Sequence, residues 1–434
     1  MSASRDRQAS IPSGRVPLWP RLTLLLLPLF AAAGPWLSPS PGSELAPTAF
    51  RVSIILLAIP TLKTLREHWP SLPATHRLFV MTGALFGAWA GLTLLWTPTP
   101  STGIRQLAGY ASGYLGALVI LAASMKAKRS WHLLLLGFGL ATVMIALVIQ
   151  WEISTGQHLL TANQEFFRGN SVAATFIGTN NLAAFLLISF SAGVSLATHA
   201  SPPWIRIAGI GSSALSAWGA FQTDSRAVLL AIPAILLAVL LLSARTNAAA
   251  SLGILLGVAI AVSAKWRTLA DFISIRAEQA DRGATESDER RTELVSYAFD
   301  VLWRTGGMGS GSGSITAFQA TDPLYPLREP TPIHNTLPQV AAEYGFIGFI
   351  LLGLLALSPL ISSTGKHADP SVQDLRPTVF ILAVLSLLIT AWLGFVLADL
   401  TWWMCLASAL ALSASITSPR NRHTAPTRLR NRRV

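Results

Sequence analysis

The decisive stretch of this sequence is WHLLLLGFGLATVMIALVIQW, residues 131–151, which contains no Asp, Glu, Lys or Arg. Its length matches the roughly 17–25 apolar residues that an α-helix needs to cross the hydrocarbon core of a bilayer. Because lipid offers no hydrogen-bond partner to a bare backbone, such a run is stable there as a helix. We therefore predict a transmembrane helix here, and similar apolar runs recur along the chain.

The composition of the whole chain agrees with a membrane protein. Of the 434 residues, 52% are hydrophobic and 12% are charged, and the mean hydropathy is +0.51. Soluble domains carry about 25% charged residues, so this chain lacks the charge to cover a surface in water. A soluble enzyme, a disordered protein and a nucleic-acid-binding module are therefore disfavoured, despite a net charge of +12. The single cysteine, Cys405, leaves no disulfide framework and no thiolate metal site.

Twelve apolar runs indicate an all-α polytopic membrane protein with about 12 transmembrane helices. We expect spans at 22–37, 49–64, 77–96, 104–124, 131–151, 180–198, 204–221, 226–243, 247–264, 339–361, 376–395 and 399–416. The chain then divides into an N-terminal tail (1–21), spans 1–9 (22–264), a large and partly helical loop (265–338), spans 10–12 (339–416) and a basic tail (417–434).

The distribution of basic residues orients these spans. If both termini are cytoplasmic, 20 of the 32 Lys and Arg fall in short inner loops and tails. Only four fall in short outer loops: Arg51, Arg105, Arg168 and Arg226. Cytoplasmic loops carry an excess of Lys and Arg, whereas long loops cross the membrane largely regardless of charge. We therefore predict that the loop 265–338 faces outward and that the basic tail lies against anionic lipid in the cytoplasm.

The large loop contains a predicted amphipathic helix at about 287–303. Its apolar residues recur at the i, i+3, i+4 and i+7 spacing of one helix face: Leu294, Tyr297, Ala298 and Val301. Arg290 and Arg291 stand in its first turns. They are typical of a solvated, salt-bridged helix surface. They could also bind a phosphate group, because a guanidinium group donates two parallel hydrogen bonds to phosphate oxygens. The glycine-rich stretch 306–313 has no P-loop Gly-Lys-Ser/Thr, so we expect a flexible turn whose backbone could shape a pocket wall.

A histidine, His334, lies in Pro-Ile-His-Asn, residues 332–335, just before the tenth predicted span. A histidine can take a proton from an attacking hydroxyl near neutral pH, although an isolated histidine is commonly structural. Other outer residues of interest are Arg168 and the pair Ser225-Arg226, which opens the eighth span. Each arginine alone could anchor a helix end at the headgroups. No second histidine or acidic cluster stands at metal-ligand spacing, so we expect no metal site.

With these residues the chain resembles the bacterial O-antigen ligase family, in the superfamily that also holds O-antigen polymerases and protein O-oligosaccharyltransferases. The resemblance rests on the span count, the late outer loop and three motifs. The motifs are Ser225-Arg226, Arg291 with Ala298 before the glycine run, and His334-Asn335 followed by Gln339, Glu343, Tyr344, Gly345 and Gly348. Where relatives show Asn-Pro-Asn before the sixth span, this chain reads Thr179-Asn180-Asn181.

The resemblance implies transfer of O-antigen polysaccharide from undecaprenyl pyrophosphate to a sugar hydroxyl of lipid A-core. The reaction would occur at the periplasmic face of the Gram-negative inner membrane, with inversion and without cofactor or metal. It implies His334 as the base, with Arg226 and Arg291 holding the pyrophosphate. Further residues implied in donor binding are Arg168, Ser225, Arg290, Asn181, Asn335 and Asp399. The implied partners are the donor, the acceptor and membrane lipids, and no nucleic acid.

Other readings of the sequence remain open. A polymerase or a protein O-oligosaccharyltransferase would use the same donor with a different acceptor. A lipid or polysaccharide transporter usually carries ionisable residues at mid-membrane depth, whereas Glu343 and Asp399 here lie near span ends. A scaffolding membrane protein would not need arginines and a histidine on one outer face.

Overall fold

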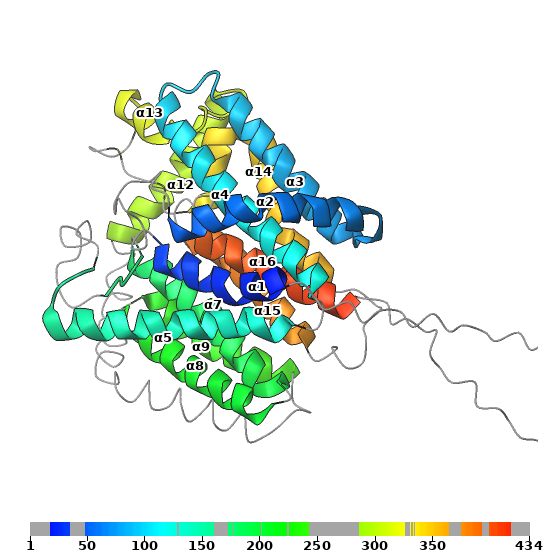
Figure 1. The fold of residues 1–434 in the computed structure, drawn as a ribbon. Helices are drawn as coiled ribbons and strands as arrows, with labels where there is room; N and C mark the ends of the chain where they lie inside the picture. The colour runs from blue at the N-terminus through cyan, green and yellow to red at the C-terminus, as the bar shows by residue number, and fades with distance from the viewer. Residues whose placement is uncertain are drawn as a thin grey trace, which may run out of the picture.

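The computed structural model describes residues 18–34, 48–127, 130–159, 172–176, 178–200, 202–223, 225–242, 286–325, 330, 333, 335–363, 375–392 and 399–417. Within these ranges all regular secondary structure is helical, which confirms the all-α class (Figure 1). The predicted span 247–264 lies outside the described residues.

Every other predicted span coincides with a helix. The first five helices are α1 (Leu18–Ala33), α2 (Ala49–His68), α3 (Ala74–Thr93), α4 (Pro100–Lys126) and α5 (Trp131–Thr155). Then come α7 (Thr179–His199), α8 (Pro203–Gln222), α9 (Arg226–Leu242), α14 (Thr336–Ser363), α15 (Arg376–Trp392) and α16 (Leu400–Thr417). The helix predicted in the large loop is confirmed as α12 (Glu286–Arg304), which is followed by the short α13 (Ile315–Thr321).

Several of these helices suit a bilayer. Among the described residues, α4, α5, α7 and α14 are long and apolar enough to cross one, and α1, α15 and α16 contain shorter apolar helices. The chain is therefore a multi-pass membrane protein, and the number of twelve spans stays a prediction.

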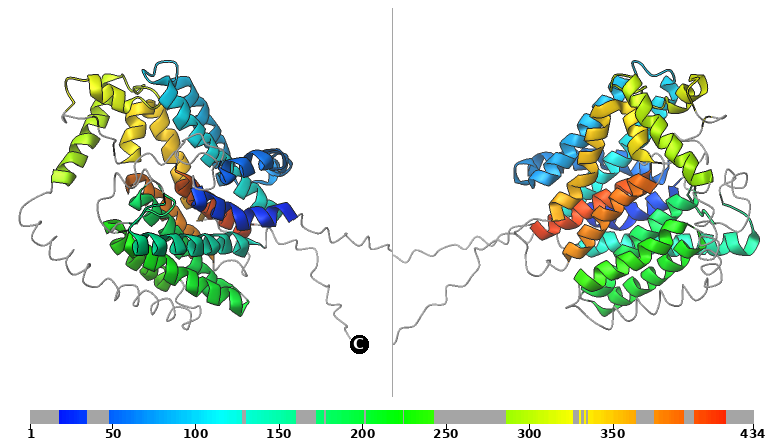
Figure 2. Two further views of the ribbon diagram at one scale, coloured as in Figure 1. Left: turned by 60° about the vertical axis from the view of Figure 1, so that its left-hand side comes forward. Right: turned by 180° about the vertical axis from the view of Figure 1, so that it is seen from behind.

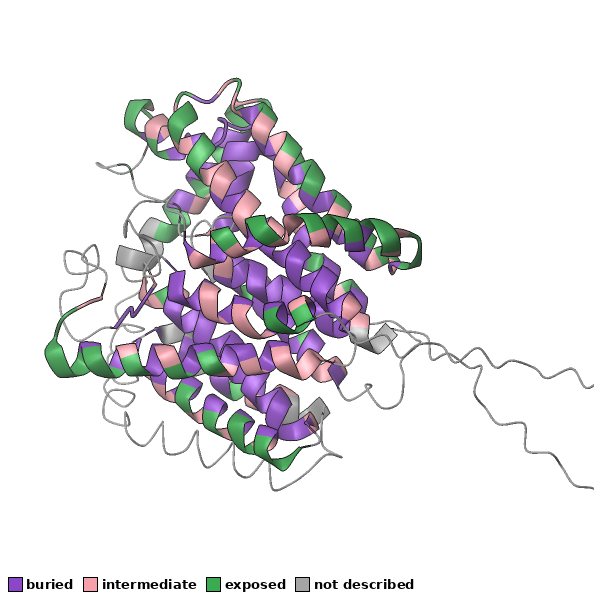
Figure 3. Ribbon diagram, viewed as in Figure 1, coloured by how far each residue is buried: buried purple, intermediate pink, exposed green. Residues whose placement is uncertain are grey.

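The centre of the bundle consists of α7 and α16. The apolar window of α7 is 94% buried, and α16 is buried from Thr401 to Ser413 (Figure 3). A helix that is apolar all round belongs in such an interior. Trp403 of α16 packs its ring against Tyr110 and Tyr114 of α4, with centroids 5.4 and 5.9 Å away. This packing holds the N-terminal part of α16 against α4.

The helices α14 and α16 run in the same direction. Ser362 near the end of α14 donates a hydrogen bond to Ser413 near the end of α16 at 2.7 Å between hydroxyl oxygens. Their N-termini therefore share the opposite end of the bundle, which we call the junction end. The helix α12 lies beside α14 (Figure 2), with the Trp303 and Phe346 rings 5.2 Å apart.

The orientation of the chain can be tested with reporter fusions. The charge distribution places Thr285 outside and the C-terminus inside. A reporter that works only in the periplasm should therefore give a signal when fused at Thr285 and none when fused after Val434. A reporter active only in the cytoplasm should give the reverse pattern. Equal signals from the two sites would contradict the predicted orientation.

Candidate functional site

The N-termini of α7, α9 and α16 meet at one place. Ser225 Oγ donates a hydrogen bond to Asn180 Oδ1 at 3.1 Å, and Asn181 Nδ2 donates one to Asp399 Oδ2. The fold thus joins residues that lie far apart in the sequence. We call this group the three-helix junction: Asn180, Asn181, Ser225 and Asp399. It brings together three residues that the sequence analysis assigned to donor binding, namely Asn181, Ser225 and Asp399.

Two of these residues shape helix starts. The Ser225 carbonyl accepts the N–H of Val228 at 3.1 Å, so α9 begins directly after Ser225. Asp399 Oδ1 accepts the backbone N–H of Thr401 at 2.7 Å, which is the bond of an N-cap residue. Helix N-termini carry roughly half a positive charge, and Arg226 is the first residue of α9. Because Asp399 already caps α16, the starts of α7 and α9 are the helix ends at the junction that suit an anion.

A buried carboxylate, Glu152, fixes the backbone on both sides of the segment 160–171. Its side chain is 1% exposed, and it accepts backbone N–H groups from Leu159 (3.2 Å), Ala173 (3.1 Å) and Ala174 (3.0 Å). Such bonds to a charged acceptor are among the stronger ones in proteins. The sequence reasoning did not single out Glu152, although a lone acidic residue at the end of an apolar run was the available signal.

The neighbours of His334 are both held in place. Ile333 is 1% exposed and belongs to a small core with α12 and α13. Asn335 Oδ1 accepts the N–H of Leu337 at 3.2 Å, which caps the start of α14. His334 itself lies outside the described residues.

That small core is closed by a polar cluster between α12 and the end of α13. Arg304 Nη2 lies 2.6 Å from Asp322 Oδ2, and Tyr297 donates its hydroxyl to the same oxygen at 2.8 Å. The guanidinium of Arg304 lowers the pKa of Asp322 to about 2. The apolar members of the core are Leu294, Tyr297, Ala298, Val301, Ile315, Ile333 and Ala342. The predicted face of α12 is therefore buried, and it holds Ile333 next to α14.

The glycine-rich stretch 306–313 is packed on two sides, which corrects the expectation of a flexible turn. On one side it bonds to α14 through three backbone pairs: Ser310 N to Ala342 O (2.8 Å), Gly311 N to Glu343 O (2.9 Å) and Phe346 N to Gly307 O (2.9 Å). On the other side three side chains before α4 donate to its carbonyls: Trp96 to Gly309 (3.2 Å), Thr97 to Ser312 (2.8 Å) and Thr99 to Gly313 (2.9 Å). We call this segment the glycine clamp.

The helix α14 bends where it meets the clamp. Gly345 has φ 68° and ψ −166°, a region that is essentially restricted to glycine. Two residues earlier, Glu343 is fully buried, and its carboxylate accepts the N–H of Gly313 at 3.3 Å and the amide of Gln339 at 3.4 Å. The clamp therefore fixes the first turns of α14, directly after His334-Asn335.

Replacement of Gly345 by alanine should destabilise the protein. A methyl group there would overlap the Gly307 carbonyl oxygen, and the backbone conformation alone costs about 1–3 kcal/mol for other residues. We expect a lower thermal midpoint for Gly345→Ala in detergent. The control is Gly353→Ala in the same helix, since no atom lies within 4 Å of the added methyl group. Equal midpoints for the two variants would contradict the constraint.

The four predicted arginines lie in parts of the chain that the structure describes to different extents. Arg291 is exposed on α12. For Arg226 and Arg290 the structure describes the helical backbone, and Arg168 lies outside the described residues. The sequence reasoning missed Asn180 as a partner of Ser225, although it quoted Asn180 as part of a motif.

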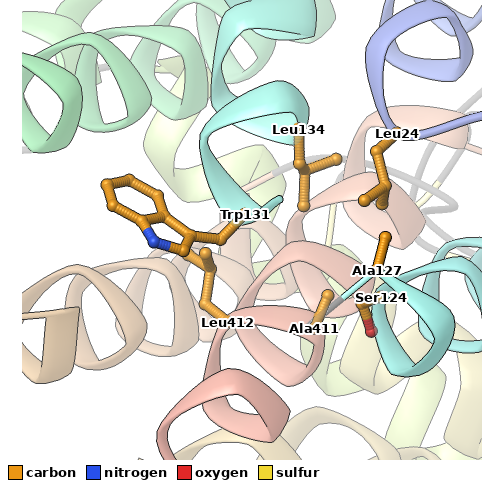
Figure 4. A pocket seen from close by; sticks show the side chains of 7 residues that line it. All are labelled: Leu24, Ser124, Ala127, Trp131, Leu134, Ala411 and Leu412. Carbon is orange, nitrogen blue, oxygen red and sulfur yellow. The ribbon is translucent and has the colours of Figure 1, made fainter. Parts of the chain in front are cut away.

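Two hollows elsewhere in the described structure are lined mainly by apolar side chains, and one of them, between α5 and α8, has a volume of about 300 Å³. Near the C-terminal end of α16, a crevice encloses no space for even a water molecule (Figure 4). Its lining residues are Leu24, Ser124, Ala127, Trp131, Leu134, Ala411 and Leu412. Across the described ranges, His, Cys, Asp and Glu form no group of three that could hold a metal ion.

Comparison of the sequence with known proteins shows which family it resembles. Residues 211–353 match the family model described as O-Antigen ligase. The chain is also similar to the teichuronic acid biosynthesis protein TuaE of Bacillus subtilis (strain 168), with 23% identity over 278 residues. That match covers 61% of this chain and 56% of TuaE, which is less than two thirds of the relative. The resemblance to the O-antigen ligase family that the motifs at Ser225, Arg291 and His334 indicated is therefore confirmed over residues 211–353.

Proposed function

We propose that this protein is an O-antigen ligase. It transfers O-antigen polysaccharide from undecaprenyl pyrophosphate to a sugar hydroxyl of lipid A-core at the periplasmic face of the inner membrane. The observation that carries the proposal is the three-helix junction, where the start of α9 with Arg226 meets the starts of α7 and α16. The family match over residues 211–353 supports the class of membrane glycosyltransferase.

The arrangement suits the departure of a pyrophosphate. As the bond to the anomeric carbon breaks, negative charge grows on the leaving group. Preorganised positive charge at a site of low dielectric stabilises that charge more than water does. Arg226 and the N-terminus of α9 supply it at the junction, while Arg168, Arg290 and Arg291 supply further guanidinium groups for the donor. Asn181 and Ser225 help to hold the donor there.

The acceptor hydroxyl loses its proton to His334 in this proposal. A histidine is suited to that step because its pKa lies near neutral pH. Ile333 in the small core and Asn335 at the start of α14 hold the backbone on its two sides. Attack on the face opposite the pyrophosphate inverts the anomeric centre, and the step requires no divalent metal.

A lipid-linked polysaccharide polymerase is the second candidate. The family match and the similarity to TuaE, which is named for teichuronic acid biosynthesis, support a polysaccharide ligase or polymerase. A polymerase would take the same kind of donor, and its acceptor would be another lipid-linked sugar chain. The two candidates therefore differ in the acceptor.

The lipopolysaccharide of a deletion strain distinguishes the candidates. For a ligase, we expect loss of every capped lipopolysaccharide species, together with accumulation of lipid-linked polymer. Wild-type gene on a plasmid should restore the normal band pattern. Capping with a single repeat in the deletion strain would identify a polymerase, and an unchanged band pattern would contradict both candidates.

A further inference from the structure

The helix α12 carries a second apolar surface, on the side away from its small core. Phe299 is 38% exposed and Trp303 is 68% exposed, and they lie one helical turn apart on one face. Leu294, Ala298 and Val301 on the other side are buried. Burial in the small core therefore accounts for only part of the apolar surface of α12.

The exposed face continues into the lipid-facing surface of α14. The Trp303 ring meets the ring of Phe346 edge to face, at 5.2 Å between centroids. Phe346 is the first of a row of exposed apolar side chains along α14, namely Phe346, Ile347, Ile350, Leu354, Leu357 and Ile361. Since α14 is long and apolar enough to cross a membrane, this row faces lipid. The face of α12 thus lies at one end of a surface that is already in the bilayer.

The polar residues of α12 lie on a neighbouring face. Glu293 and Asp300 are exposed there, and Asp300 pairs with Arg304 at 2.9 Å. A helix with an apolar face beside a charged face can lie in the plane of a membrane interface, and tryptophan is enriched at that depth. We propose that Phe299 and Trp303 insert into the boundary between headgroups and acyl chains, in the leaflet at the junction end. The bilayer is thus the partner that covers this face of α12.

The proposal can be tested with spin labels in vesicles of phosphatidylethanolamine and phosphatidylglycerol. The chain has one cysteine, Cys405, which is buried, so Cys405→Ser gives a background without reactive thiols. Labels are attached at Phe299→Cys and Trp303→Cys. The controls are Ile350→Cys on the lipid-facing row and Glu293→Cys on the charged face. Collision rates are measured with oxygen, which concentrates in lipid, and with a water-soluble nickel chelate.

We expect the ratio of oxygen to nickel collisions at residues 299 and 303 to resemble that at Ile350, and to exceed that at Glu293 severalfold. All four positions are exposed or partly exposed, so the labelled variants should fold, and size-exclusion chromatography checks this. High nickel access at 299 and 303 would overturn the proposal, because the face would then lie in water. Low access to both reagents would overturn it too, because protein would then cover the face. Neither outcome depends on the proposed glycosyl transfer.

Discussion

Replacement of His334 by alanine should reduce the rate of polysaccharide transfer by about 10²–10⁴, the usual contribution of a general base. Donor binding should remain near that of the wild type, because the arginines that hold the pyrophosphate are unchanged. The measurement is transfer from a lipid-linked donor to lipid A-core by the purified protein in detergent. It is made in the presence of EDTA, since the proposed step requires no divalent metal.

The structure supplies a control for folding in this experiment. Ile333 and Asn335 anchor the backbone on either side of His334, so the thermal midpoint of His334→Ala should equal that of the wild type. His68→Ala is the matched variant, because His68 lies at the end of α2 and its ring contacts the Thr64 carbonyl at 3.0 Å. A folded His334→Ala protein with wild-type transfer would show that another group, or water, accepts the proton.

Replacement of Arg226 by lysine should impair both donor binding and turnover. Lysine keeps the positive charge and loses the planar pair of N–H donors that fits a phosphate. A hydrogen bond to a charged group contributes about 1.5–3 kcal/mol, so the loss of one corresponds to a decrease in kcat/KM of about 10- to 100-fold. Donor titration and initial rates on the same preparation separate the two effects.

The matched variant for this test is Arg77→Lys, since Arg77 is exposed on α3 and is predicted to lie on the cytoplasmic side. It should leave transfer unchanged. Arg226→Gln, which also removes the charge, should lower kcat/KM further than Arg226→Lys does. Wild-type binding and turnover in Arg226→Lys would remove Arg226 from the pyrophosphate site. Loss of activity in Arg77→Lys would show that the assay reports general damage.

The helices of this protein could be predicted because their cause is local. A run such as 131–151 has one stable form in lipid, and the spacing of Leu294 and Val301 is specific to a helix. Boundaries were harder to predict. The first span was expected at 22–37, whereas α1 covers Leu18–Ala33. It ends before Gly34, whose φ is 49°, and the apolar residues after Gly34 misled a prediction made from hydropathy alone.

The contacts between the residues of the candidate site could not be predicted from the sequence. Asn181 and Asp399 are 218 residues apart, and no periodicity relates them. The contacts between the glycine clamp and α14 involve mainly backbone groups, which leave no trace in the side-chain pattern. Composition therefore predicted the turn at 306–313 but wrongly expected it to be flexible, because its partners only emerged from the fold. The Ser225-Arg226 motif was recognisable because both residues lie at one helix start.

The glycine clamp also bears on how the protein is made. Trp96 donates its indole N–H to Gly309, which follows 213 residues later in the chain. At about 5–20 residues per second, a ribosome needs on the order of 10–40 s to synthesise that stretch. During this interval the turn before α4 has been translated while its partners have not. The contacts between the glycine clamp, α14 and the turn before α4 are consequently formed late in biogenesis, and a nascent chain released before Phe346 would lack the contacts that bend α14.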